Sequence, residues 1–159
     1  MTELNRLLQR LCEADVEFVI VGGFAAMLHG SSLLTRNLDV CCLLTDGEID
    51  KLRQAFKDLN PVHRFTPQRL SFLENPRPGE PIRNIYLQTD LGPINFLGSI
   101  AGVGGYNEVR EHSTVFNLFG HKVFVIGIDD LLRGKETLGR EKDLLAVKEL
   151  RAIIEKNGN

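Results

Sequence analysis

The feature that most constrains this chain is the segment 17–42, where apolar runs alternate with glycines. "EFVIVG" (17–22) is rich in β-branched and aromatic residues and ends at a glycine, which predicts a strand. "GFAAMLHG" (23–30) predicts a short helix that is closed by Gly30. "NLDVCCLL" (37–44) predicts a second strand with both faces buried in a sheet. A strand, helix and strand in this order require a sheet with helices packed against it.

The rest of the chain extends this pattern. Hydrophobic periodicity and turn residues predict four helices and two hairpins, which are the helices 3–14, 45–60, 129–139 and 140–158 and the hairpins 82–100 and 113–127. Asp46 and Asp129 are the expected N-caps of two of these helices. The hairpin turns are expected at 91–93 and 120–121. Five of the six prolines lie in 61–81, which predicts an irregular excursion.

The final helix carries a regular apolar stripe. Its expected inner face consists of Leu144, Leu145, Val147, Leu150, Ile153 and Ile154. The order of predicted elements favours an α/β (α+β) fold, a mixed β-sheet flanked by helices, with a helical pair at the C-terminus. The length of 159 residues fits a single domain over 1–159.

Charge and composition exclude some function classes. The net charge is −2, so the chain has no global basic field for non-specific nucleic-acid binding. No apolar run approaches the ~20 residues that span a bilayer, and the first 15 residues lack a signal-peptide core. We therefore expect a cytoplasmic protein without membrane partners. Cys12, Cys41 and Cys42 have no framework spacing, so reduced thiols are expected rather than disulfides or a zinc site.

The chemistry is concentrated between the two first strands. Glycines at a strand-to-helix turn, here Gly22 and Gly23, let backbone N–H groups approach a phosphate closely. Asp39 opens the next strand, and position 37 lies on the same face because side chains alternate along a strand. Position 95, on the hairpin strand "PINFLG", is a third place from which a side chain could reach the same metal. Mg²⁺ prefers such hard oxygen ligands.

The segment "VGGFAAMLHG....T.NLDV" is similar to the nucleotidyltransferase superfamily, specifically to small stand-alone bacterial proteins related to the AbiEii-type toxin transferases. The family pattern is Gly-Gly or Gly-Ser, His-Gly, Arg-x-Thr and Asp-x-Asp, with a third Asp on a later strand. "INFLGSIAGVGGY" and "IGIDDLLRGKETLGREKDLLAVKEL" resemble its later segments, so the resemblance runs from about residue 17 to residue 150.

The resemblance implies a nucleotide site and a metal site. It implies that phosphates are bound by Gly22, Gly23, Thr35, Lys135, Arg140 and Lys142. It implies that positions 37, 39 and 95 are catalytic and hold Mg²⁺. His29, Gly30 and Asp143 also match the pattern. The family's two-metal chemistry moves a nucleoside monophosphate from an NTP to a hydroxyl, and here the acceptor could be a protein, an RNA or a small molecule.

The departures from the family lie in the metal site. The first and third acids are Asn37 and Asn95, and the family's arginine is Leu33. Three carboxylates would bring three negative charges, whereas Asn37, Asp39 and Asn95 bring one. Each lost attraction is worth roughly a few kcal/mol near a protein surface, so transfer should slow by several orders of magnitude. Asp-to-Asn changes arise by design or by drift, and Leu33 favours drift.

Several alternatives stay open on the sequence. The acids that could substitute are Asp90, Asp46, Glu74 and Glu80, of which Asp90 is the best placed. His29 is expected to close its helix rather than to take part in chemistry. "GVGG" (102–105) lacks the lysine of a phosphate loop and predicts a plain turn. Two function classes remain: a nucleotidyltransferase with impaired catalysis and weakened Mg²⁺ binding, or a non-catalytic nucleotide-binding or regulatory partner of toxin–antitoxin type.

Overall fold

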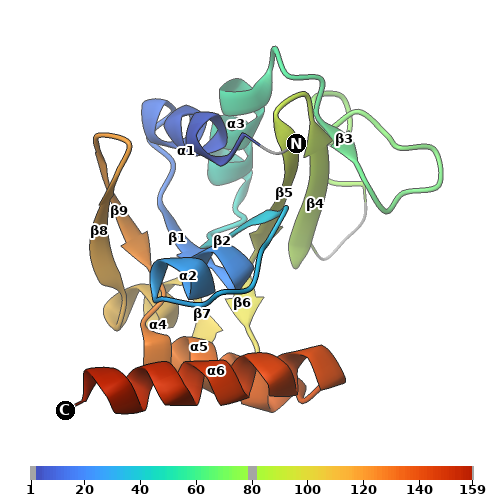
Figure 1. Ribbon diagram of the computed structural model, residues 1–159. Coiled ribbons are helices and arrows are strands. Elements are labelled where there is room, and N and C mark those ends of the chain that lie inside the picture. Colours follow the sequence, from blue (N-terminus) through green and yellow to red (C-terminus); the bar gives the residue numbers. More distant parts are fainter. Residues whose placement is uncertain (1–2, 79–81, 159) are drawn as a thin grey trace.

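A computed structural model describes residues 3–78 and 82–158. Its main sheet has the strand order β3-β4-β5-β2-β1-β9-β8, and β6 and β7 form a second small sheet (Figure 1). The strands are β1 Phe18–Val21, β2 Leu38–Cys42, β3 Val62–His63, β4 Asn84–Thr89, β5 Gly92–Leu97, β6 Ser99–Ile100, β7 Gly104–Gly105, β8 Thr114–Leu118 and β9 His121–Val125. The helices are α1 Leu4–Glu13, α2 Gly22–Leu28, α3 Asp46–Phe56, α4 Tyr106–Glu111, α5 Ile128–Leu138 and α6 Glu141–Asn157.

The sheet is mixed, as the sequence predicts. β1 pairs with β9 and β2 pairs with β5 in parallel, while the other neighbours in the main sheet are antiparallel. α1 and α3 pack together at one end of the molecule, and the C-terminal pair α5 and α6 lies at the opposite end (Figure 1). The predicted fold class is therefore confirmed, including the helical pair.

The two central strands form the middle of the core. All four residues of β1 are buried, and the neighbouring residues Cys41 and Cys42 of β2 are both buried although they face opposite sides of the sheet. Cys12, Cys41 and Cys42 are free thiols, as predicted. Burial raises the pKa of Cys41 to about 12, so this thiol stays protonated at neutral pH.

Several predicted boundaries are wrong by one or two residues. Thr45, not Asp46, is the N-cap of α3, because the Thr45 hydroxyl accepts a hydrogen bond from the Glu48 N–H at 3.3 Å. The N-cap of α5 is Gly127, so Asp129 lies inside the first turn of that helix. Asp46 instead pairs with Arg77.

The hairpin turns also shift along the chain. The β4–β5 turn is at Asp90 and Leu91, since Thr89 pairs with Gly92, and Pro93 lies within the strand. The β8–β9 turn is at Phe119 and Gly120, which both have positive φ, and His121 already belongs to β9. Two-residue hairpin turns favour positive φ because it matches the twist of the strands.

The expected inner face of α6 is only partly correct. Val147 and Leu150 are buried, but Leu144 and Leu145 are exposed. α6 contacts α5 along one side, and the side that carries Leu144 and Leu145 faces solvent. Apolar spacing alone does not say which part of a stripe a neighbouring helix covers.

The segment 99–111 has more structure than the predicted turn. "GVGG" does turn the chain, between the short strands β6 and β7, and α4 follows directly. The N-cap of α4 is Gly105, which has no side chain to mark the start of a helix. No helix in the described parts of the chain is long and apolar enough to cross a membrane.

Candidate functional site

Three neighbouring strands bring the predicted site residues together. The end of β1 lies beside the start of β2, with Val21 opposite Asp39, and Asp39 in turn lies opposite Asn95 on β5. The glycine turn, Asp39 and Asn95 are therefore neighbours in space although they lie far apart in the sequence. Strand register alone produces this arrangement.

The glycine turn is shaped by its neighbours. Gly22 has φ +67°, and a Cβ at this position would collide with the Asp39 carboxylate. A Cβ at Gly23 would lie 2.9 Å from Cβ and Oγ1 of Thr35. Thr35 in turn donates through Oγ1 to the Asn37 carbonyl at 3.2 Å. Glycine is needed at both positions because the backbone approaches Asp39 on one side and Thr35 on the other.

A chain of hydrogen bonds ends at Asp39. Arg64 donates through Nη2 to Oδ1 of Asn95 at 2.7 Å, and Asn95 donates through Nδ2 to Oδ1 of Asp39 at 2.8 Å. Arg64 also donates through Nη1 to the Leu87 carbonyl at 2.8 Å. A guanidinium only donates and an ionised carboxylate only accepts, so the two partners fix the orientation of the Asn95 amide.

The environment of Asp39 opposes its charge in part. Burial raises the pKa of Asp39, while the Asn95 hydrogen bond and the positive charges of Lys135, Arg64 and Lys142 lower it, and burial prevails. Burial likewise lowers the pKa of Arg64, which the charge of Asp39 counteracts. Asp39 is therefore a carboxylate held in a poorly hydrated place by cations around it, which is common at functional sites.

The C-terminal helices contribute the predicted cations, but two of these cations share a partner. Arg140 donates through Nε to Oδ2 of Asp143 at 2.6 Å, and Nζ of Lys135 lies 3.6 Å from Oδ1 of Asp143. The Asp143 side chain is fully buried. Lys142 is exposed. Asp143 thus holds Lys135 and Arg140 in place at the end of α5 and the start of α6.

A cavity of about 170 Å³ joins these two groups of residues. It is lined by Gly22, Asp39, Lys135 and Arg140, and most of its other walls are apolar residues of β5, β6, α5 and the strand ends. Ligand pockets usually measure ~300–1,000 Å³, so this cavity has room for part of a nucleotide. The structure therefore brings one glycine of the turn, the remaining acid and two of the predicted cations to one place.

The donor set does not fit a two-metal site. Within residues 3–78 and 82–158, no three histidine, cysteine or acidic side chains come close enough to hold a metal ion. The Asn95 carbonyl, which could ligate Mg²⁺, already accepts from Arg64, and its amide N–H group points at Asp39. A guanidinium next to the ligands would repel a divalent cation. Asp39 is the one acid of the expected triad, and Arg64 stands beside it.

Comparison with known proteins gives the fold a name. No protein-family model and no curated protein matches the chain. A lincosamide antibiotic adenylyltransferase, LnuA, with lincomycin bound, is 18% identical and has a TM-score of 0.59, with 96% of this chain and 98% of that chain covered. The fold is that of the nucleotidyltransferases.

Two further solved structures agree with this nucleotidyltransferase fold. An antigenic nucleotidyltransferase-like protein from Paracoccidioides brasiliensis is 15% identical, with a TM-score of 0.57 and coverage of 98% of this chain and 78% of that chain. The antibiotic-resistance factor ANT(2'')-Ia is 9% identical, with a TM-score of 0.58 and coverage of 96% and 81%. At sequence identities this low, the structural likeness establishes the architecture alone. This architecture is the one that the sequence predicted.

The acids proposed as substitutes lie away from Asp39 in this nucleotidyltransferase fold. Asp90 is at the β4–β5 turn, where it accepts a hydrogen bond from Asn60 at 2.8 Å, five residues and about 16 Å along the strand from Asn95. Asp46 pairs with Arg77. Glu74 is exposed in the excursion after β3, and Glu80 lies outside the described residues. The role of third acid therefore stays unfilled within the described chain.

Sequence reasoning missed Arg64, and it expected His29 at the end of its helix, where the structure has it. Arg64 follows β3 in the proline-broken excursion, and no spacing links it to Asp39. Only the pairing of β3 with β4, and of β4 with β5, brings it to Asn95. His29 caps the C-terminal end of α2, and its Nε2 lies 2.7 Å from the Ile126 carbonyl, which is a structural contact.

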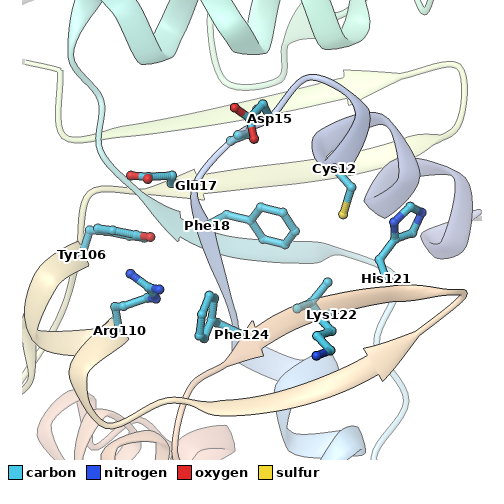
Figure 2. A pocket seen from close by; sticks show the side chains of 11 residues that line it. Cys12, Asp15, Glu17, Phe18, Tyr106, Arg110, His121, Lys122 and Phe124 are labelled. Atoms are coloured by element: carbon cyan, nitrogen blue, oxygen red, sulfur yellow. The ribbon is translucent and has the colours of Figure 1, made fainter.

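A second cavity, of about 280 Å³, lies between the α1–β1 loop, α4 and β9 (Figure 2). At the edge of this cavity, the Arg110 guanidinium stacks over the Phe124 ring, 3.9 Å from the ring centre. Acidic side chains (Asp15, Glu17) and basic ones (Arg110, Lys122) both line it, and none of the predicted site residues does. The mixed charge selects no ligand class, so the candidate site remains the one around Asp39.

Proposed function

We propose that this protein is a nucleotidyltransferase-fold protein that binds nucleotide phosphates beside Asp39 and whose metal-dependent transfer is impaired. Its relatives would be the small stand-alone proteins related to the AbiEii-type toxins, with a degenerate acidic triad. Ancestrally, such a site moves a nucleoside monophosphate from an NTP to a hydroxyl acceptor. In this chain, side-chain cations take over the electrostatic role that Mg²⁺ has in such sites.

The observation that carries the proposal is the hydrogen-bonded chain Arg64–Asn95–Asp39. An aspartate at position 95 would place two carboxylates side by side, which a metal normally compensates. The asparagine instead accepts from a cation and donates to an anion, so the site is neutralised without a metal. Losing both the metal and the third acid removes the means of activating an acceptor hydroxyl.

The local charge supports binding of a polyanion. Arg64, Lys135, Arg140 and Lys142 surround two carboxylates, Asp39 and Asp143, and so leave a net positive charge. The whole protein carries −2, so this excess is local. A phosphate chain would meet Lys135 and Arg140 at the cavity and the backbone of Gly22 beside them.

The solved neighbours suggest the kind of acceptor that such a fold has served. LnuA is an antibiotic adenylyltransferase with lincomycin bound, so this fold accommodates a small molecule. The absence of a basic surplus in this chain makes a small molecule or a protein a better acceptor than a long RNA. Because transfer is impaired, we expect the protein to keep nucleotide binding although it has lost turnover.

Calorimetric titration with each NTP tests the proposal, once with Mg²⁺ and once with EDTA. We expect binding in EDTA with a Kd within about threefold of the Kd in Mg²⁺. Arg64→Met should weaken this binding by about tenfold, because it removes one of the positive charges that balance Asp39 beside the cavity. Arg6→Met, at an exposed arginine of α1, is the matched control. Binding that requires Mg²⁺ would overturn the proposal, because the metal site would then be working.

A variant that restores two acids tests the loss of the metal site separately. Asn37→Asp combined with Asn95→Asp should make nucleotide binding Mg²⁺-dependent, whereas Asn117→Asp, the same change at an exposed site on β8, should not. Unchanged metal dependence in the double variant would show that the pocket, and not only the ligand set, has departed from the family.

A second candidate, a regulatory role as a protein partner, is favoured by one observation. Large apolar side chains (Leu33, Leu34, Leu138, Leu144, Leu145) are exposed on α5, α6 and the loop before β2. Exposed apolar groups of this kind commonly mark interaction surfaces. Absence of nucleotide binding in both Mg²⁺ and EDTA would favour this candidate over the first.

A further inference from the structure

The outer side of α6 carries an apolar stripe with charged ends. Leu144 is 54% exposed and Leu145 is 65% exposed, and both lie at the centre of the stripe. Glu141 lies one turn before them and Lys148 one turn after them, so all four residues share one face of the helix. They also line one groove of about 600 Å³ along α5 and α6. Nothing in the described chain covers this face.

The charges at the ends of the stripe are left for a partner. Among the described residues, neither Glu141 nor Lys148 takes part in an ion pair, whereas nearby Arg151 pairs with Glu136 of α5 at 2.5 Å. Glu141 and Lys148 are seven residues apart, about 10.5 Å along the helix axis, which is too far for a pair with each other. Their charges can therefore pair with groups on another molecule.

The stripe is complementary to itself under a two-fold rotation. If a second α6 lies antiparallel across the first, with the axis between positions 144 and 145, position n of one copy faces position 289 − n of the other. Leu144 then faces Leu145, and Glu141 faces Lys148, each twice. The apolar centre and the charged ends are matched at the same register, as an isologous interface requires.

A neighbouring loop adds apolar surface beside the same helix. Ser31 and Ser32 donate hydrogen bonds through their hydroxyls to Glu149 of α6, at 2.5 and 2.6 Å. These bonds hold the next two residues beside α6, and Leu34 there is 90% exposed. Figure 1 shows α6 along the outer edge of the molecule, away from α1 and α3, so a partner can approach it freely.

We infer that α6 is a homodimer interface, on which a second copy of this chain docks antiparallel through Leu144 and Leu145, with Glu141 and Lys148 paired between the copies. The two leucines lose contact with water in the dimer, and this burial drives association. The ion pairs set the register and the direction of the helices, as flanking charges do in helix pairs.

Sedimentation velocity over a concentration series measures the association. We expect the unchanged protein to dimerise, and Leu144→Ser combined with Leu145→Ser to raise the dimer Kd at least about a hundredfold. Circular dichroism checks that this variant is folded, which it should be, because both leucines are exposed. If the unchanged protein stays monomeric at about 100 µM, a concentration on the order of the Kd of a weak interface, the inference is wrong.

Charge reversal identifies the pairing. Glu141→Lys makes the ends of the stripe all positive, and Lys148→Glu makes them all negative, so each variant alone should dimerise about tenfold more weakly. A mixture of the two should form a heterodimer with the original affinity, and the double variant should also recover it. Lys57→Glu, the same charge change on the far side of the molecule, should have no effect.

The single variants test the direction in which the copies dock. In a parallel arrangement position 141 would face position 141 and position 148 would face position 148, so like charges would already repel in the unchanged protein. Neither single variant would then weaken the dimer, and the mixture would bind more tightly than the unchanged protein. If both single variants weaken the dimer but the mixture does not recover, the copies meet in another way and the inferred register is wrong. These readouts do not depend on nucleotide binding.

Discussion

Asp39 and Asp143 are two carboxylates withdrawn from water in quite different ways. Asp143 accepts from the Nε of Arg140 at 2.6 Å and from the Arg140 backbone N–H at 3.2 Å, and Lys135 lies nearby. Among the described residues, Asp39 accepts one neutral hydrogen bond through its side chain, from Asn95. The pKa of Asp143 is lowered, chiefly by the Arg140 hydrogen bond, whereas the pKa of Asp39 is raised, chiefly by burial.

The difference separates an acid that stabilises the fold from the acid of the proposed site. Asp143 closes the capping box that starts α6, so its charge stabilises the fold. Burial opposes the charged form of Asp39, and a fold tolerates such a conflict mainly where a ligand will meet it. The family pattern that the sequence resembles contains both acids, and only their surroundings distinguish the cap of α6 from the acid of the proposed site.

The largest expected effect is at the structural acid. Asp143→Ala should lower the free energy of unfolding by about 2 to 3 kcal/mol, because it removes the helix cap and leaves Arg140 and Lys135 without their partner. Chemical denaturation measures this. Asp50→Ala, which removes an exposed Asp–Arg pair of the same i,i+3 spacing on α3, should cost less than about 0.5 kcal/mol. Equal losses in the two variants would contradict the structural role of Asp143.

A backbone change tests how tightly Asp39 is enclosed. Gly22→Ala should cost about 1 to 2 kcal/mol, since Gly22 has φ +67° and a Cβ there would press against the Asp39 carboxylate. The control is Gly47→Ala, at a helical position where an added Cβ meets nothing within 4 Å; it should be neutral or slightly stabilising. Thermal unfolding of both variants provides the measurement, and a neutral Gly22→Ala would mean that the turn is not held against Asp39.

The smallest expected effect has the most specific pH dependence. A raised pKa means that the stability from Asp39 is fully present below the pKa of the unfolded chain and is lost as the pH rises through the folded pKa. Asp39→Asn should therefore raise the free energy of unfolding at pH 7, by no more than about 1 kcal/mol. The gain should vanish in acid, below the ordinary range of an aspartate.

Asp143 should behave in the opposite way across the same pH series. Its lowered pKa makes its contribution present above the ordinary aspartate range and lost as the pH falls through the folded pKa. Denaturation of the unchanged protein, Asp39→Asn and Asp143→Ala from pH 3 to pH 7 compares them directly. If both substitutions changed stability with the same sign of pH dependence, the distinction between the two acids would be lost.

Much of the fold was predictable from local patterns. The glycine turn between β1 and α2, the apolar run of β2 and the two hairpins have periodicities and turn residues that act over a few positions, so they are readable without coordinates. Their boundaries were less certain, because a cap such as Thr45 competes with Asp46 one residue away. α4 was missed because its N-cap, Gly105, has no side chain to signal a helix.

The site was predictable in part for the same reason. The positions of Gly22, Asp39 and Asn95 follow from motifs, and Asn37 and Asn95 lie where the resemblance to the family leads us to expect acids. What a residue does there depends on partners distant in the sequence. Lys135 and Arg140 were expected to face phosphates, and the fold shows that both also hold Asp143.

The sequence by itself determined the class of fold and the free cysteines, since composition and short-range spacing encode these. That Asn37 and Asn95 replace acids is an expectation from the resemblance to the family. Only the tertiary structure decided that Arg64 reaches Asn95 beside Asp39, and that Leu144 and Leu145 face outward. Both depend on contacts between segments far apart in the chain, from strand pairing in one case and from helix packing in the other, and such contacts follow from the assembled core rather than from neighbouring residues.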